Sequence, residues 1–239
     1  MADPYSAIVD DGLARLGLAL PAPARAAIDG HAALLLAWTA AINLTAIRDP
    51  EGVARLHVLD SLAAVPLLRD AGIRTFVDLG SGGGYPGLPL AAALDVDDAL
   101  LVDSIGKKAR FLETAAEATG LAPRLRVAAT RAEQLATDPG HRERWEAVTA
   151  RAVASLAELA ELAMPLLVPG GLLVAWKRVP VDEELAALAA LPADLGAGVP
   201  EVLPVAVTGL EDHRLVVIPK SGRTADRWPR DPAERRRGR

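Results

Sequence analysis

The chain contains no cysteine, and this absence excludes disulfide bonds, thiolate metal sites and a cysteine nucleophile. Histidine is scarce as well. The four histidines are scattered along the sequence without the spacing of metal ligands, so no metal site is expected. They are His31, His57, His141 and His213.

The sequence also lacks an apolar run long enough to cross a membrane. The segment 32–42 is too short for that, and the acidic N-terminus has no basic stretch ahead of an apolar one, so no signal peptide is expected. We therefore predict a cytoplasmic protein without membrane contact. The net charge of −5 argues mildly against a nucleic-acid partner, although segment 221–239 holds seven arginines and three acids.

Glycine is concentrated in the stretch Thr75–Pro89. Strand-forming residues end at Asp78, five glycines follow between Gly80 and Gly87, and an apolar segment continues from Leu88. This order predicts a buried strand, a tight turn and the start of a helix. Bare backbone amides in such a turn form an electropositive cradle for a ligand.

Two ligand classes fit this glycine pattern. The register Gly82-x-Gly84-x-x-Gly87 matches the dinucleotide fingerprint, whereas Asp78-x-Gly80-x-Gly82-x-Gly84 resembles the first motif of enzymes that bind S-adenosyl-L-methionine. Asp78 would repel a pyrophosphate but can engage a cationic amino-acid group directly or through water. The second register is therefore favoured, and a purely structural corner would not require five glycines.

The pattern along the chain predicts an α/β fold, and the glycine register resembles that of the Rossmann-like methyltransferases. Helical segments fill residues 1–70, and strands then alternate with helices, which indicates a mostly parallel sheet with helices on both faces. We divide the chain into a helical extension (1–70), a methyltransferase domain (71–220) and a basic, disordered tail (221–239). Strands are expected at 75–79, 99–103, 125–128, 147–150, 172–176, 202–207 and 213–218, the fifth following a turn at 169–171.

Ligands of such sheets bind beyond the carboxyl ends of the strands, so the residues that follow each strand are the candidates. Asp103 ends the second strand and suits the ribose hydroxyls, although it could equally cap the next helix. After the third strand, the Ala132 amide and the Glu133 carboxylate could grip an adenine. Arg151 and Lys177 end the fourth and fifth strands. The cations of segment 107–110 suit either RNA phosphate or solvent.

Several separated motifs stand in a fixed order along the chain. They are Asn43-Leu44-Thr45, His57-x-x-Asp60-Ser61, the glycine run, Asp103-Ser104-x-Gly106-Lys107, Arg131-Ala132-Glu133, Arg151-Ala152-x-Ala154-Ser155, Lys177 and His213–Ile218. Together they resemble one family, the bacterial small-subunit rRNA guanine-N7 methyltransferases, also called glucose-inhibited division protein B. The resemblance implies seven strands with the last antiparallel, and methylation of N7 of guanosine 527 in 16S rRNA. It also places Gly80, Tyr85, Ala132, Glu133 and Arg151 at the family's cofactor positions.

Guanine N7 has a lone pair and no proton to lose, so we hypothesise catalysis by positioning, without a general base. Arg151, Lys177 and Arg131 would orient the base or its phosphates, and Asn43 and His57 would complete the wall. We expect the protein to be a monomer. Its expected partner is 16S rRNA, within the 30S subunit or an assembly intermediate. The alternatives are a small-molecule methyltransferase, a non-catalytic ribosome-associated protein that binds S-adenosyl-L-methionine, and an NAD-dependent oxidoreductase.

Overall fold

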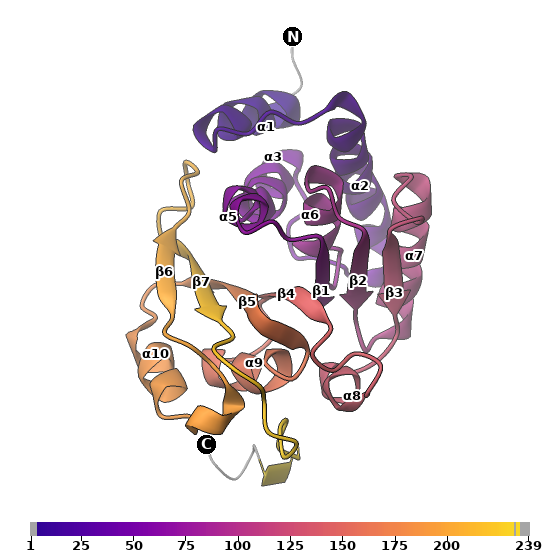
Figure 1. Cartoon of the computed structure of the whole chain (residues 1–239). Coiled ribbons are helices and arrows are strands. Elements are labelled where there is room, and N and C mark those ends of the chain that lie inside the picture. The colour runs from indigo at the N-terminus through magenta and orange to yellow at the C-terminus, as the bar shows by residue number, and fades with distance from the viewer. Residues whose placement is uncertain (1–3, 232, 235–239) are drawn as a thin grey trace.

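The computed structural model describes residues 4–231 and 233–234 and contains one seven-stranded sheet (Figure 1). The strand order is β3-β2-β1-β4-β5-β7-β6, with β7 antiparallel to both of its neighbours and the first five strands parallel. The expected fold class is confirmed. The strands are β1 (Thr75–Leu79), β2 (Asp98–Val102), β3 (Leu125–Ala128), β4 (Trp145–Arg151), β5 (Leu167–Arg178), β6 (Glu201–Pro204) and β7 (His213–Pro219).

Helices precede the sheet and then alternate with its strands. Ahead of β1 lie α1 (Pro4–Arg15), α2 (Ala22–Ile42), α3 (Pro50–Gly52), the π-helix η1 (Val53–Leu59), α4 (Asp60–Leu62) and α5 (Val65–Asp70). Between the strands lie α6 (Gly87–Ala93), α7 (Gly106–Ala118), α8 (Ala132–Thr137), α9 (Leu156–Ala163), α10 (Asp182–Ala189) and the short 3₁₀ helix η2 (Ala193–Leu195). Among the described residues, no helix combines the length and the apolar character that a membrane span requires.

Two apolar cores lie on opposite faces of the sheet, because successive strand residues point to opposite sides. Phe76 of β1 belongs to the core that the extension, α6 and α7 cover, whereas Val77 belongs to the core beneath α8, α9 and α10 (Figure 1). Leu35 of α2 and Val58 of η1 are fully buried in the first core. The extension is thus a packed layer on the sheet, and this packing fixes η1 near the carboxyl ends of β4 and β5.

The turn predicted at 169–171 lies inside β5 rather than ahead of it. Trp145 pairs with Leu167 and Ala147 with Leu172, so one intervening residue of β4 faces four of β5 across an irregularity in the register. Gly170 has a φ of 87°, a left-handed conformation that glycine adopts readily, and it lets the strand continue through this bulge. β6 is also shorter than the predicted segment 202–207.

The tail differs from the expected disorder over the residues that the structure describes. The Arg142 guanidinium donates hydrogen bonds to the carbonyl oxygens of Thr224, Ala225 and Trp228, at 2.9–3.1 Å. The Trp228 side chain is buried, and the indole donates to Asp194. Buried apolar surface and satisfied carbonyls therefore order this segment against the sheet. The remaining residues of the predicted tail, 232 and 235–239, lie outside the described residues.

Candidate active site

The glycine turn between β1 and α6 is shaped by two close approaches. Gly80 has a φ of 69°, and an added Cβ would lie 2.7 Å from Val153 Cγ2 in the segment after β4. Gly84 has a φ of 89°, and an added Cβ would lie 2.7 Å from His31 Nε2 of α2. The turn therefore needs glycine at both positions, and it is held between the extension and the end of β4.

Asp78 lies beneath this turn and is fully buried. Its Oδ1 accepts a hydrogen bond from Thr149 Oγ1 of β4 at 2.8 Å, and its Oδ2 accepts from the Gly87 amide at 3.3 Å. Burial raises the pKa of this carboxyl to about 6. The carboxylate ties the start of α6 to the sheet, and it does not line the adjoining pocket, so the expected direct contact with a ligand is not built here.

A pocket of about 380 Å³ opens beyond the carboxyl ends of β1, β2 and β3. Of the residues predicted to bind a cofactor, Gly80, Asp103, Ala132 and Glu133 line it. Arg131, predicted to orient the acceptor, lines it as well. We call this the first pocket.

Asp103 is a polar group of the first pocket that two backbone amides hold in place. Its Oδ2 accepts a hydrogen bond from the Gly82 amide at 2.9 Å, and its Oδ1 accepts from the Ile105 amide at 2.8 Å. Each carboxylate oxygen keeps a further lone pair, so the side chain is fixed and can still accept from two vicinal hydroxyls. The expected helix cap is not formed, since α7 has no side-chain cap at Ile105; Asp103 instead anchors the glycine turn and the backbone just ahead of the helix.

A second pocket, of about 340 Å³, lies beyond β4, β5 and β7. It adjoins the first pocket, because Ala152 lines both. Arg151, which the family likeness places at the cofactor, lines this second pocket and not the first, together with His57 and Lys177. Its lining is Leu56, His57, Asp60, Arg151, Ala152, Trp176, Lys177, Arg178 and His213.

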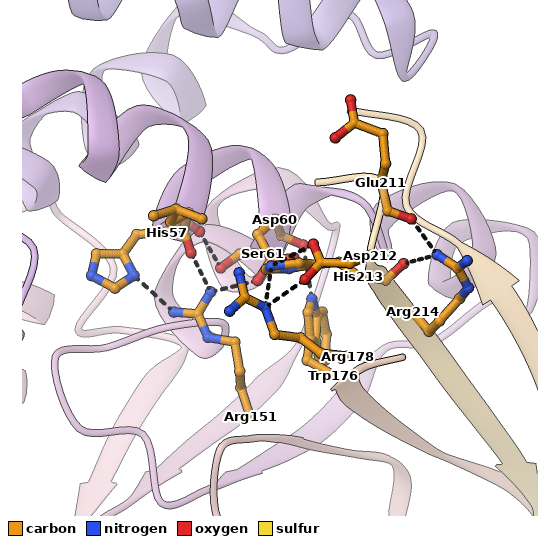
Figure 2. A network of polar contacts seen from close by, with 11 residues as sticks. His57, Asp60, Ser61, Arg151, Trp176, Arg178, Glu211, Asp212, His213 and Arg214 are labelled. Carbon is orange, nitrogen blue, oxygen red and sulfur yellow. Dashed lines mark hydrogen bonds and ion pairs between the residues drawn. The ribbon is translucent and has the colours of Figure 1, made fainter. Parts of the chain in front are cut away.

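A buried carboxylate connects the walls of the second pocket (Figure 2). Asp60, 1% exposed, accepts a hydrogen bond from Arg151 Nη1 on Oδ2 and one from His213 Nδ1 on Oδ1, both at 2.9 Å. Trp176 Nε1 donates to the backbone oxygen of Asp60 at 2.8 Å. The sequence motifs contain Asp60 and His213, but their convergence is a tertiary feature that spacing along the chain does not reveal.

His57 is held in a neutral form. Its Nδ1 lies 3.2 Å from Arg151 Nη2, which can only donate, so Nε2 carries the proton and donates to Thr45 Oγ1 at 2.8 Å. Burial, followed by the charge of Arg151, lowers the pKa of His57 to about 4. The imidazole therefore contributes a flat, uncharged wall at neutral pH.

Tyr85 lies between two histidines rather than in either pocket. Its ring stacks on His57 at a centroid distance of 4.8 Å and on His31 at 4.4 Å, and the Arg151 guanidinium carbon lies 5.6 Å from the ring centroid. Burial raises the pKa of the Tyr85 hydroxyl well above its usual range. Tyr85 therefore supports the second pocket from behind, and it lines neither pocket.

Of the remaining predicted site residues, Lys177 lines the second pocket, whereas Asn43, Gly82 and Gly84 line neither pocket. Lys177 Nζ donates to the Ala154 carbonyl at 2.7 Å and pairs with Glu184 at 2.6 Å, so it fixes the segment after β4. Asn43 is an exposed residue at the end of α2 that accepts from Arg48 at 3.3 Å, and it lines neither pocket. Gly82 and Gly84 shape the turn without lining a pocket.

Comparisons with known proteins agree on one family. The family model described as GidB, rRNA small subunit methyltransferase G, matches residues 25–213. The ribosomal RNA small subunit methyltransferase G of Roseiflexus sp. (strain RS-1) is 42% identical over 200 residues, which cover 84% of this chain and 85% of the relative. The protein of that name from Deinococcus deserti is 43% identical over 207 residues, covering 85% of this chain and 84% of the relative.

Solved structures share the fold at low sequence identity. An O-methyltransferase from Bacillus cereus in complex with SAH superposes with a TM-score of 0.60 at 17% identity, covering 90% of this chain and all of that one. A methyltransferase from Geobacter sulfurreducens gives a TM-score of 0.55 at 16% identity, covering 91% and 98% of the two chains. Likeness at this level concerns the architecture alone.

Proposed function

The chain belongs to the rRNA small subunit methyltransferase G family, and from that premise we propose that it transfers a methyl group from S-adenosyl-L-methionine to small-subunit rRNA. The finer proposal is that the acceptor is N7 of guanosine 527 in 16S rRNA. The first pocket would take the methyl donor and the second pocket the guanine. The two pockets meet at Ala152, where the reacting atoms would face each other.

The first pocket has the donor set that an adenosine requires. Asp103 offers lone pairs to the ribose hydroxyls, while Ala132 and Glu133 stand where an adenine edge would lie. Gly80 leaves the backbone bare beneath the ligand. The sulfonium of the bound compound would supply an electrophilic methyl group. The residues of the chain need only hold donor and acceptor in line, an effect that can contribute about 7–11 kcal/mol to lowering a barrier.

The observation that carries the choice of N7 is the absence of an available base in the described lining of the second pocket. Both oxygens of Asp60 accept hydrogen bonds from Arg151 and His213. Both ring nitrogens of His57 and of His213 are engaged as well, the latter with Asp60 and Arg178. An amine or hydroxyl acceptor would have to lose a proton, whereas guanine N7 has none to lose.

Cations in the second pocket suit the same acceptor. Guanine presents O6 beside N7, and an arginine can donate to O6 or to the adjoining phosphate while the N7 lone pair stays free for the methyl group. Arg151 is 16% exposed at the end of β4 and lines the pocket. Lys177 lies beside it but already donates to Ala154 and pairs with Glu184. We therefore assign the contact with guanine to Arg151 and the shaping of the pocket to Lys177.

The distribution of charge supports an RNA partner despite the acidic total. Lys107 and Arg110 are exposed on the first turn of α7, beyond the carboxyl end of β2, and neither forms an ion pair with a described residue. At the opposite edge of the sheet, Arg74 pairs with Asp95 and Asp97. Cations at a helix N-terminus oppose the helix dipole, and RNA phosphates would compensate them.

The test is incubation with labelled S-adenosyl-L-methionine and, in parallel, 30S subunits from cells lacking the protein, naked 16S rRNA and a metabolite extract. Label should enter RNA, and mass spectrometry of the digested rRNA should locate it as 7-methylguanosine at position 527. Label in a metabolite would instead select a small-molecule enzyme. Binding of the donor without transfer would select a non-catalytic protein, and binding of NAD in its place an oxidoreductase.

A further inference from the structure

We propose that Asp60 is the positioning residue of the acceptor site: it orients the Arg151 guanidinium and joins the extension, β4 and β7 into one wall. The expected effect on the rate of methyl transfer rests on the proposed function. The orienting of Arg151 by Asp60 rests on the geometry alone. Asp60 directly follows η1, Arg151 ends β4 and His213 begins β7, so the contact joins segments far apart in the chain (Figure 2).

Three of the five N–H groups of the Arg151 guanidinium already contact protein acceptors. Nη1 donates to Asp60 Oδ2 and to the Leu56 carbonyl oxygen, both at 2.9 Å, and Nη2 contacts His57 Nδ1. Of the five N–H donors of an arginine, these contacts leave the Nε–H and one Nη2–H for a ligand. The guanidinium cannot turn about its own axis without breaking them, so Asp60 decides where the remaining donors lie.

Asp60 cannot itself touch an acceptor. Its side chain is 1% exposed, and each of its oxygens already accepts from a neighbour at 2.9 Å. The indole of Trp176 also anchors its backbone. A buried carboxylate is costly to desolvate and is retained only with partners, and here those partners are a candidate substrate-binding arginine and a second residue of the same pocket. Its role is therefore exerted through Arg151.

An amide at this position would break the arrangement for a definite reason. His213 donates from Nδ1 to Asp60, and its Nε2 accepts from Arg178 Nε at 3.0 Å, so the tautomer is fixed. In Asp60→Asn only one oxygen remains, which can accept from Arg151 or from His213. The new NH₂ group would face a donor in either orientation. One of the two walls must therefore shift while the shape of the side chain is kept.

The kinetic experiment compares Asp60→Asn with Glu161→Gln. Glu161 is the matched control because it is also buried and paired with an arginine, Arg230, but lines neither pocket. We expect kcat for transfer to 30S subunits to fall about 100-fold in Asp60→Asn, the cost of misplacing a group by about 1 Å. In Glu161→Gln kcat should stay within about twofold even if the melting temperature falls equally. Affinity for S-adenosylhomocysteine should be unchanged in both variants.

The double variant separates positioning from general support. If Asp60 acts through Arg151, Asp60→Asn should add no further loss of kcat to that of Arg151→Lys. Full additivity, or wild-type kcat in Asp60→Asn, would overturn the proposal. Should Asp60→Asn fail to fold, His213→Gln frees one oxygen of Asp60 and is expected to lower kcat about tenfold, again without additivity with Arg151→Lys.

A readout without RNA keeps this inference distinct from the proposed function. In protein labelled with ¹⁵N-arginine, the restrained Arg151 guanidinium should give separate Nη resonances, which should merge in Asp60→Asn and stay separate in Glu161→Gln. Merged resonances in the wild type would overturn the positioning role. Absence of methyl transfer by the wild type would instead contradict the proposed function.

Discussion

At the scale of single residues, the second pocket is built from side chains whose hydrogen-bonding capacity is already used by other protein groups. His57 and His213 are each fixed in one tautomer, and Asp60 is shared between two donors. Such a pocket can orient a nucleophile that brings its own lone pair, but it cannot readily accept a proton. Its chemistry then depends on Arg151, which keeps two donor hydrogens for a ligand.

We predict that Arg151→Lys preserves the fold and lowers methyl transfer about 100- to 1,000-fold, the usual cost of removing one donor that stabilises a reacting group. Lysine keeps a charge beside Asp60 but loses the planar fork. Single-turnover transfer to 30S subunits measures the effect. Arg74→Lys, at the opposite edge of the sheet, is the control, and equal rates in the two variants would remove Arg151 from the mechanism.

A second prediction concerns His31. Burial lowers its pKa to about 4, so the folded protein takes up this proton later than the unfolded chain, whose histidines titrate near 6.5. Stability should therefore fall as the pH drops from about 6.5 toward 4, by up to about 3 kcal/mol from this residue. Denaturant unfolding at several pH values measures this loss in the wild type and in His31→Phe, which keeps a ring against Tyr85.

The phenylalanine variant should lose less stability on acidification than the wild type. The comparison is needed because other groups titrate nearby. His57 acts in the same direction, whereas Asp78, with a pKa raised to about 6, loses its stabilising contribution as the pH rises and so opposes both histidines. If wild type and variant lost stability equally on acidification, folding would not lower the pKa of His31, and the prediction would be wrong.

At the scale of elements, the glycine turn is the part that carries both the fold and the first pocket. We predict that Gly84→Ala mainly destabilises the protein, because its Cβ would meet the buried His31 ring, whereas Gly80→Ala mainly weakens donor binding, because Gly80 lines the pocket and its neighbour Val153 is exposed. Gly72→Ala is the control for a left-handed φ alone, with nothing within 4 Å, and should cost about 1–2 kcal/mol.

Thermal unfolding and calorimetric titration with S-adenosylhomocysteine separate the two effects. Gly84→Ala should unfold at a lower temperature than Gly72→Ala, since it adds a clash to the same backbone strain. Gly80→Ala should bind the compound more weakly than Gly72→Ala does. Equal affinities in these two variants would argue against a ligand lying on the backbone at Gly80.

Elements were the features that the sequence predicted well. Strands at 75–79 and 125–128 coincide with β1 and β3, because alternating apolar runs bounded by turn residues follow from local chemistry. The bulge in β5 was missed, since it depends on pairing with β4 rather than on Pro169 or Gly170 themselves. The glycine register likewise indicated the turn but not that Asp78 would lie beneath it.

Contacts between distant segments were beyond the reach of the sequence. Asp60 and His213 stand in recognisable motifs, yet 153 positions separate them, and no local pattern states that they meet. The family resemblance led us to expect Tyr85 at the cofactor, and no local pattern indicates that its ring packs between two histidines of the extension. The sequence thus indicated which candidate residues follow each strand, but not which pocket each of them lines.

At the scale of the whole molecule, Lys107 and Arg110 offer two exposed cations beyond the carboxyl end of β2. We predict that Lys107→Gln combined with Arg110→Gln weakens binding to 16S rRNA and reduces the slope of log K against log salt by about 1–2, as expected for the loss of two phosphate contacts. Affinity for S-adenosylhomocysteine should not change, since neither residue lines the first pocket. Filter binding over a range of salt concentrations measures the slope.

The matched control changes two arginines at the opposite edge. Arg69 and Arg124 also lack a described carboxylate partner, and they donate to the carbonyl oxygens of Ala93 and Ala91. Replacing both with glutamine removes the same net charge but should leave the salt slope unchanged. An equal loss of slope in both pairs would mean that RNA responds to total charge and not to this surface.

The shared core of the extension and the sheet bears on how any acceptor arrives. Leu35 and Val58 are buried in the same hydrophobic core as Phe76, so moving the helices of the extension away from the sheet would expose apolar surface to water. The extension is thus expected to keep its position on the sheet when RNA binds, and the conformational change is expected in the RNA. A guanine would have to leave its stack and enter the opening beside Ala152, which favours strands that are already unpaired.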